Sequence, residues 1–287
     1  MSKAVYRLSS IARPLEAKYP TNLAVLIALP LIGIGLGIHA WLSAGGGTVN
    51  AILTGLDGMV IAFLVWALGR EADPDRNLTA FASGALILYA LVMGLPVSVW
   101  TLAFALMAAR TVNRTVGQPA KPLDLVMVLI LAGLSVFSEG YALVGVVAAV
   151  AIAIDVQLDR SRTLTLIAAL VALSFTVWQL IVLEGDFAAL LWTPGSSTAL
   201  MAIIGGLVAI GLLTTLLCPS PTSVCDARGE PLSRARIRGG RLVITLTLLA
   251  GMAEGNALAH SLYPLGCVLL VTFVVGLIFA GRGKAAS

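Results

Sequence analysis

Two acidic residues, Asp57 and Glu254, lie within long apolar stretches of the chain. An ionised side chain in a membrane costs about 2.5–3.5 kcal/mol on insertion scales, so such residues are functional candidates. His39 and His260, the two histidines, and Asn256 lie near the same ends of their own apolar stretches. Buried carboxyl groups and histidines can exchange protons near neutral pH, which suits a proton-coupled transporter. The alternative is a set of hydrogen-bonded polar groups that fix helix packing.

Acidic and basic residues also gather in three short segments between apolar stretches. Carboxylates bind Mg²⁺ and arginines bind phosphate oxygens, so these segments could hold a metal-bound pyrophosphate. The alternative is a set of solvated loops whose ion pairs anchor the topology. The candidates are Arg70, Asp73, Asp75 and Arg76 in the first segment, Arg110, Asn113 and Arg114 in the second, and Asp155 and Asp159 in the third.

The placement of acidic loops after the second and the sixth apolar stretch is similar to that in intramembrane prenyltransferases of the UbiA type. The resemblance covers only those loops, and it implies an enzyme that acts on a lipid phosphate or prenyl substrate at the cytoplasmic face. The chain departs from the family because it lacks the Asn-Asp-x-x-Asp pattern and because the region between the loops is shorter.

Other residues that could carry chemistry give weaker signals. Six residues separate Cys218 from Cys225, which matches no usual zinc spacing, and Cys267 stands alone, so we expect no metal site there. No lysine falls within an apolar stretch, which excludes a retinal Schiff base, and the identity of any other cofactor is open. The net charge of +4 is explained by membrane insertion rather than by nucleic-acid binding.

The elements that must position these residues are membrane spans. Apolar residues make up 59% of the 287 residues and charged residues only 11%, whereas soluble domains carry about 25% charged residues. The pattern predicts an all-α polytopic membrane protein with about ten transmembrane helices in five hairpins. The expected spans are 22–42, 49–69, 78–93, 96–109, 123–137, 141–154, 163–183, 198–217, 242–261 and 263–281.

The basic residues predict the orientation of these spans. All 18 Lys and Arg lie in the N-terminal arm, in alternate loops or in the C-terminal tail, which places both termini in the cytoplasm. We therefore expect a multi-pass protein of the cell membrane, and of the inner membrane in a bacterium. The expected parts are an amphipathic or disordered arm (1–21), a single transmembrane domain (22–281) with its longest cytoplasmic loop at 218–241, and a tail (282–287).

Two of the predicted hairpins, 78–109 and 123–154, are unusually short. Each leg covers roughly 23 Å, against about 30 Å of hydrocarbon. They are either merely short or re-entrant, and in the re-entrant case Glu139 at the tip of the second would face a polar cavity.

Three functional hypotheses follow from these patterns. The first is a small-molecule or ion transporter with Asp57, Glu139 and Glu254 along its path. The second is a membrane-embedded enzyme that acts on a lipid phosphate or prenyl substrate at the cytoplasmic face. The third is a noncatalytic subunit or assembly factor of a membrane complex. The expected partners are the lipid bilayer and either another protein or a second copy of the chain, with no nucleic acid.

Overall fold

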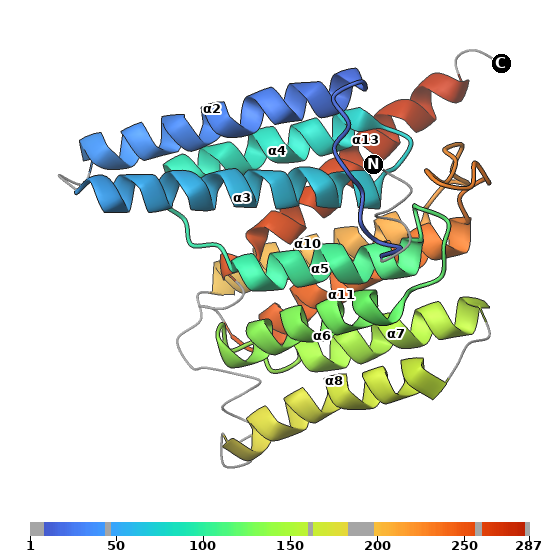
Figure 1. Cartoon of the computed structure of the whole chain (residues 1–287). Helices are drawn as coiled ribbons and strands as arrows, with labels where there is room; N and C mark the ends of the chain where they lie inside the picture. The colour runs from blue at the N-terminus through green and yellow to red at the C-terminus, as the bar shows by residue number, and fades with distance from the viewer. Residues whose placement is uncertain (1–8, 44–46, 160–162, 183–197, 256–259, 285–287) are drawn as a thin grey trace.

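The computed structural model describes residues 9–43, 47–159, 163–182, 198–255 and 260–284. Within these ranges the chain forms ten α-helices and no strand (Figure 1). They are α2 (Pro20–Ser43), α3 (Thr48–Ala72), α4 (Asn77–Val92), α5 (Val99–Asn113), α6 (Pro122–Phe137), α7 (Val144–Asp159), α8 (Thr163–Val182), α10 (Thr198–Leu216), α11 (Arg234–Ala253) and α13 (Tyr263–Lys284). Each overlaps one predicted apolar stretch, so the all-helical class and the ten helices are confirmed.

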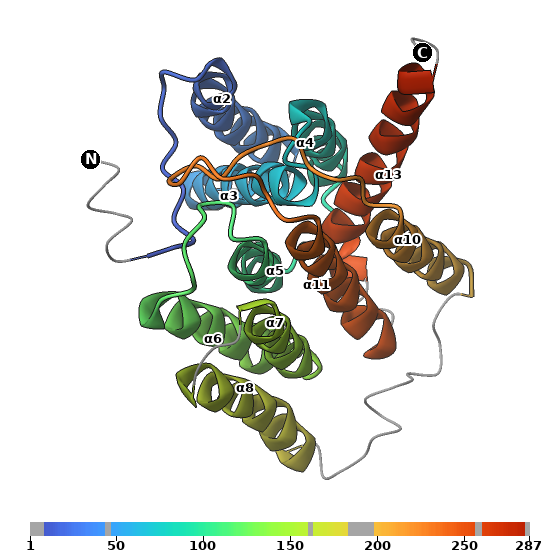
Figure 2. The ribbon, with the colours of Figure 1, turned by 90° about the vertical axis from the view of Figure 1, so that its right-hand side faces the viewer.

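Helices α5 and α11 form the centre of the bundle. Figure 2 looks along the helices and shows both surrounded by α3, α7, α10 and α13. Phe104, Leu106, Ile244 and Leu248 on these two helices are fully buried. The core therefore lies where the second predicted hairpin (α4 and α5) meets the fifth (α11 and α13).

The outer faces of the bundle are apolar. Large aliphatic side chains such as Leu31 on α2, Leu170 and Ile181 on α8 and Leu277 on α13 are exposed, although soluble proteins rarely expose continuous apolar surface of this kind. Among the described residues, four helices are long and apolar enough to cross a membrane: Pro20–Ser43, Thr48–Ala72, Leu164–Val182 and Tyr263–Ala280. These apolar helices are compatible with an integral membrane protein.

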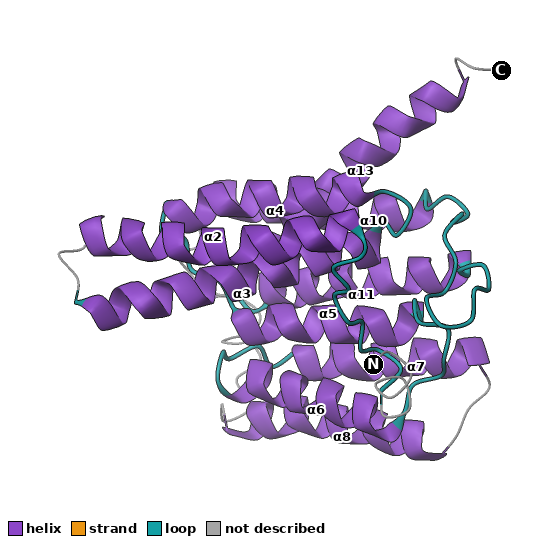
Figure 3. Ribbon diagram, turned by 45° about the horizontal axis from the view of Figure 1, so that its top comes forward, coloured by secondary structure: helices purple, strands orange, loops and turns teal. Residues whose placement is uncertain are grey.

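Helices α4 to α7 are shorter than their neighbours, as the sequence predicts. They contain 15 or 16 residues each, which is about 22–24 Å of helix, whereas α2 and α3 contain 24 and 25 residues. Figure 3 shows α2 and α3 reaching well beyond the ends of α5 and α6. The first helix pair therefore projects from the rest of the bundle.

Helix α11 begins at Arg234, eight residues before the predicted start at residue 242. Apolar content located the span, but basic residues continue the helix outward. Arg241 is buried, and backbone carbonyls take the place of water around its guanidinium. Its Nε donates to the carbonyl of Ala72 at 2.6 Å and its Nη1 donates to the carbonyl of Thr214 at 2.8 Å. These bonds satisfy carbonyl groups at the ends of α3 and α10, which lack partners within their own helices.

Helices α2 and α3 approach each other closely through glycine. A Cβ atom at Gly55 would lie 2.5 Å from the backbone oxygen of Gly33, so no other residue fits there without moving the helices. Small residues allow this kind of contact between helices in lipid.

The polar connections lie together at one end of the bundle. Figure 1 shows the N-terminal arm, the loops after α3, α5 and α10, and the C-terminus of α13 at that end. We call it the basic end; it comprises residues 9–19, 73–76, 114–121 and 217–233 together with the ends of the helices that border them. Residues 9–19 of the arm have an irregular conformation, and Ser10 and Arg13 are hydrogen-bonded to α6 and α3.

Candidate functional site at the basic end

Glu71, the penultimate residue of α3, is the most buried ionised group of the basic end, with 0% of its side chain exposed. Arg13 Nη1 and Arg110 Nε donate to Glu71 Oε1 at 3.3 and 3.2 Å. Asn113 Nδ2 donates to Glu71 Oε2 at 3.2 Å and to its backbone oxygen at 2.9 Å. One carboxylate therefore joins the arm, α3 and α5.

The position of Asn113 depends on a glycine of α11. A Cβ atom at Gly240 would lie 2.0 Å from Asn113 Oδ1, so glycine is needed for the amide to fit between α5 and α11. The amide is thereby held with its Nδ2 group toward Glu71.

The arm is attached at two further points. Arg13 Nε lies 2.6 Å from Oδ2 of Asp226, in the loop between α10 and α11. Burial lowers the pKa of Arg13, but Glu71 and Asp226 outweigh it and raise that pKa above its ordinary value, so the side chain stays charged. Ser10 donates from its backbone N and its Oγ to Asp124 at the start of α6, at 2.8 and 2.5 Å.

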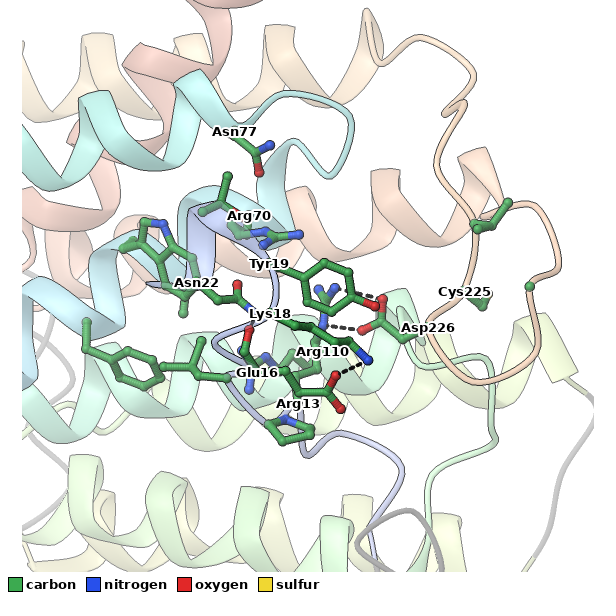
Figure 4. A pocket seen from close by; sticks show the side chains of 18 residues that line it. Arg13, Glu16, Lys18, Tyr19, Asn22, Arg70, Asn77, Arg110, Cys225 and Asp226 are labelled. Carbon is green, nitrogen blue, oxygen red and sulfur yellow. Dashed lines mark hydrogen bonds and ion pairs between the residues drawn. The ribbon is translucent and has the colours of Figure 1, made fainter. Parts of the chain in front are cut away.

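A pocket of about 530 Å³ opens between the arm, α3, α5 and the α10–α11 loop. Figure 4 shows side chains from all four segments converging on it. Its apolar wall contains Leu15, Phe63, Trp66 and Ala67, and its polar lining includes Arg13, Lys18, Tyr19, Asn22, Arg70, Asn77, Arg110 and Asp226. The pocket thus combines several cations and neutral donors with an aromatic and aliphatic wall.

Arg70 differs from the other cations of the pocket. Arg13 and Arg110 share Glu71, and Lys18 pairs with Glu16 at 2.5 Å. The guanidinium of Arg70 lies 5.6 Å from the ring centroid of Trp66, and none of the described residues forms a hydrogen bond or ion pair with it.

Trp66 itself supplies a second donor with no protein acceptor. Its Nε1 group is buried and has no hydrogen-bond partner in the described part of the chain. Buried donors without partners are uncommon in proteins and cost about 1–3 kcal/mol. Arg70 and Trp66 line the same pocket, and the guanidinium of Arg70 is the group there that is available to an anionic ligand.

The other acidic candidates of the basic end are engaged in protein contacts. Thr79 Oγ1 donates to Asp73 at 2.8 Å and Arg76 lies 3.3 Å from the same carboxylate. Arg76 also lies over the Phe279 ring at 5.1 Å. Asp75 accepts from the backbone N of Ser223 at 2.8 Å, which ties the α3–α4 turn to the α10–α11 loop.

Asp155 of α7 pairs with two arginines. Arg114 donates to it through Nε at 2.8 Å and Nη2 at 2.9 Å, and Arg236 Nη1 donates at 2.9 Å. Asp159 is the last residue of α7, and its side chain lies outside the described residues. Within the described ranges no three His, Cys, Asp or Glu side chains group as metal ligands, so the proposed Mg²⁺ site has no visible ligand set.

Two of the intramembrane candidates lie near each other at the opposite end of the bundle. Glu139 accepts hydrogen bonds from the backbone N of Trp100 at 3.0 Å and of Thr101 at 2.9 Å, so it caps the N-terminus of α5. Glu254, at the end of α11, accepts from the backbone N of Leu143, four residues beyond Glu139. Oε2 of Glu254 is buried and has no partner among the described residues.

The remaining candidates of that group are separate. The side chain of Asp57 is exposed on α3 and lines neither of the two cavities described here. His39 is exposed on α2, 3.4 Å from Ser43 Oγ, and His260 lies beside Tyr263 with ring centroids 6.4 Å apart. Asn256 lies outside the described residues. The structure therefore does not gather Asp57 with the two histidines.

No protein family model, curated protein or solved structure matches the chain. Function has to be inferred from the site itself.

Sequence reasoning identified Arg70, Arg110 and Asn113 but missed Glu71, Arg13, Asp124 and Asp226. A signal for Glu71 exists in the sequence, because it follows Leu64 by seven residues and Leu68 by three and so continues a buried stripe of α3. Arg13 and Asp226 give no such signal, because 213 residues separate them.

Proposed function

We propose that the protein spans the membrane with its basic end toward the cytoplasm and binds a phosphate-bearing anion in the pocket around Arg70. The observation that carries the proposal is the guanidinium of Arg70, which forms no hydrogen bond or ion pair with the described residues and lies in a pocket whose other cations are paired with carboxylates. Four cations and three carboxylates surround the pocket, which leaves one positive charge without a counterpart. Arginine matches phosphate geometry, and Asn77 and Tyr19 supply further donors.

The membrane orientation is supported by the clustering of basic loops at the same end as the pocket. A phosphate there would lie at the level of lipid headgroups, so its source is either a lipid or a soluble phosphate. The proposal is for binding: Glu16 and Asp226, the carboxylates among the described lining residues, each pair with a basic side chain.

The test is a binding measurement with purified protein in nanodiscs of zwitterionic lipid. The ligands are inorganic phosphate, pyrophosphate and a phosphatidic acid with long chains, so that soluble and lipid sources are distinguished. Arg70→Gln should weaken whichever binds by about 10- to 100-fold, because hydrogen bonds to charged groups contribute about 1.5–3 kcal/mol.

Arg228→Gln is the matched control, since Arg228 lies in the same end but is half exposed and does not line the pocket. Equal affinities of the Arg70 variant and the unmodified protein for all three ligands would refute the proposal. So would an equal loss in the Arg228 variant, because it would indicate general attraction by the basic end.

A second candidate function, transport, is favoured by Glu254 alone, whose Oε2 is buried without a partner. In proteoliposomes loaded with a pH-sensitive dye, Glu254→Gln should abolish a proton flux that Asp57→Asn leaves intact, because Asp57 is exposed on the outside of α3. Identical fluxes in both variants would exclude a role for Glu254.

A further inference from the structure

A second cavity lies on α2 and α3, the helices that contribute Asn22 and Arg70 to the first pocket. It is a groove of about 590 Å³ on the α2–α3 pair. Ile34, Ile38 and Trp41 of α2 and Ile52, Leu56 and Met59 of α3 line it. Gly33, Gly37 and Gly55 form its floor, where the close helix contact leaves no side chains to fill the space.

The groove continues the face that carries the pocket. On α3, Met59 of the groove and Phe63 of the pocket are four residues apart, which is one helical turn on one face. On α2, Asn22 of the pocket and Pro30 of the groove are joined by Leu26, four residues from each and 38% exposed. The polar pocket at the basic end and the apolar groove therefore lie on the same face of the α2–α3 pair.

The length of this path selects the kind of tail. Arg70 and Met59 are eleven residues apart, about 16 Å along the helix axis, so the groove starts beyond the middle of a hydrocarbon core of about 30 Å. The path from Arg70 to Thr48, at the far edge of the groove, is about 33 Å. The tail of an ordinary phospholipid anchored at Arg70 ends near the midplane and would not reach into the groove.

We infer that the groove holds the single long tail of a polyisoprenoid phosphate whose phosphate binds in the Arg70 pocket. This inference rests on the proposed function and names its substrate class. A tail that enters the groove leaves one hydrocarbon environment for another, so the gain in affinity comes from its packing against the groove side chains rather than from transfer out of water.

The test compares a long-chain polyprenyl monophosphate with farnesyl monophosphate, in nanodiscs of zwitterionic lipid. The long ligand should bind several-fold tighter, because only its tail is long enough to pack in the groove. Replacing Ile34 and Ile52 with Trp should remove that advantage, because both side chains line the groove. The control is Leu31→Trp with Leu53→Trp, at exposed neighbours on the same helices that do not line it.

Cross-linking gives a measurement on the unmodified protein. A polyprenyl monophosphate with a photoreactive group at the end of its tail should label α2 and α3 between Pro30 and Met59. Equal affinities of the two ligands, both dependent on Arg70, would overturn the inference and leave the proposed function standing. Binding independent of Arg70 would overturn both. Conversion of a dimer into monomers by the Ile34 and Ile52 variant would also overturn the inference, since the groove would then join two copies.

Discussion

Replacement of Glu71 by Gln should destabilise the protein by about 3–5 kcal/mol, the cost of leaving a buried charge without its partner. Gln keeps the size of the side chain and one acceptor oxygen, so packing is preserved. Arg13 retains Asp226, but Arg110 has no other carboxylate within ion-pair distance in the described residues. The penalty therefore comes mainly from the buried guanidinium of Arg110.

This change should lower Tm by roughly 6–20 °C, measured by tryptophan fluorescence in detergent, since each kcal/mol shifts Tm by about 2–4 °C in domains of this size class. Glu230→Gln is the control, because Glu230 is exposed and lies 4.0 Å from Arg228, a pair expected to contribute under about 1 kcal/mol. Replacing Glu71 and Arg110 together by Met should recover much of the stability. A Glu71→Gln protein that melts within about 1 °C of the unmodified chain would refute the charge-burial reasoning.

Three further outcomes are expected. Burial raises the pKa of the Cys225 thiol, which slows its labelling by maleimide. Asp75→Ala should free the α10–α11 loop and speed that labelling by about 5- to 30-fold if the attachment contributes 1–2 kcal/mol. An unchanged labelling rate would show that the loop is held elsewhere. Burial raises the pKa of Asp75, but bonds from Ser223 and Thr222 outweigh it and lower that pKa. The attachment should therefore be complete at neutral pH and be lost as pH falls through the lowered value. Asp75→Asn should make the protection factors of the loop amides, which correct for intrinsic exchange rates, insensitive to acid. Glu139→Ala should cost about 0.5–2 kcal/mol of unfolding free energy through loss of the α5 cap, and a cost near zero would mean that Ser98 replaces it.

The helices could be predicted from the sequence because each is an apolar run bounded by charge, Gly or Pro. The start of α11 could not, since Arg234 to Arg241 look like loop residues until their carbonyl partners on α3 and α10 are known. Apolar content measures transfer into lipid, whereas a basic helix end is stabilised by neighbouring helix termini.

The candidate site, too, was only partly predictable from the sequence. Arg70 and Arg110 were identified because paired charges at span ends suggest phosphate binding. Their roles differ, however, and only the position of Glu71 separates them: it neutralises Arg110 and leaves Arg70 available. That distinction depends on which side of α3 faces the core, and on an arm that reaches the pocket from the other end of the chain.

The attachment of the arm also sets an order of events during synthesis. Arg13 leaves the ribosome early, but its partner Asp226 follows 213 residues later, which is on the order of 10–40 s at typical rates of translation. Contacts between such distant residues form late because the intervening chain must first be ordered. The pocket wall made by the arm is thus the last part of the basic end to be completed, although its residues are among the first to be made.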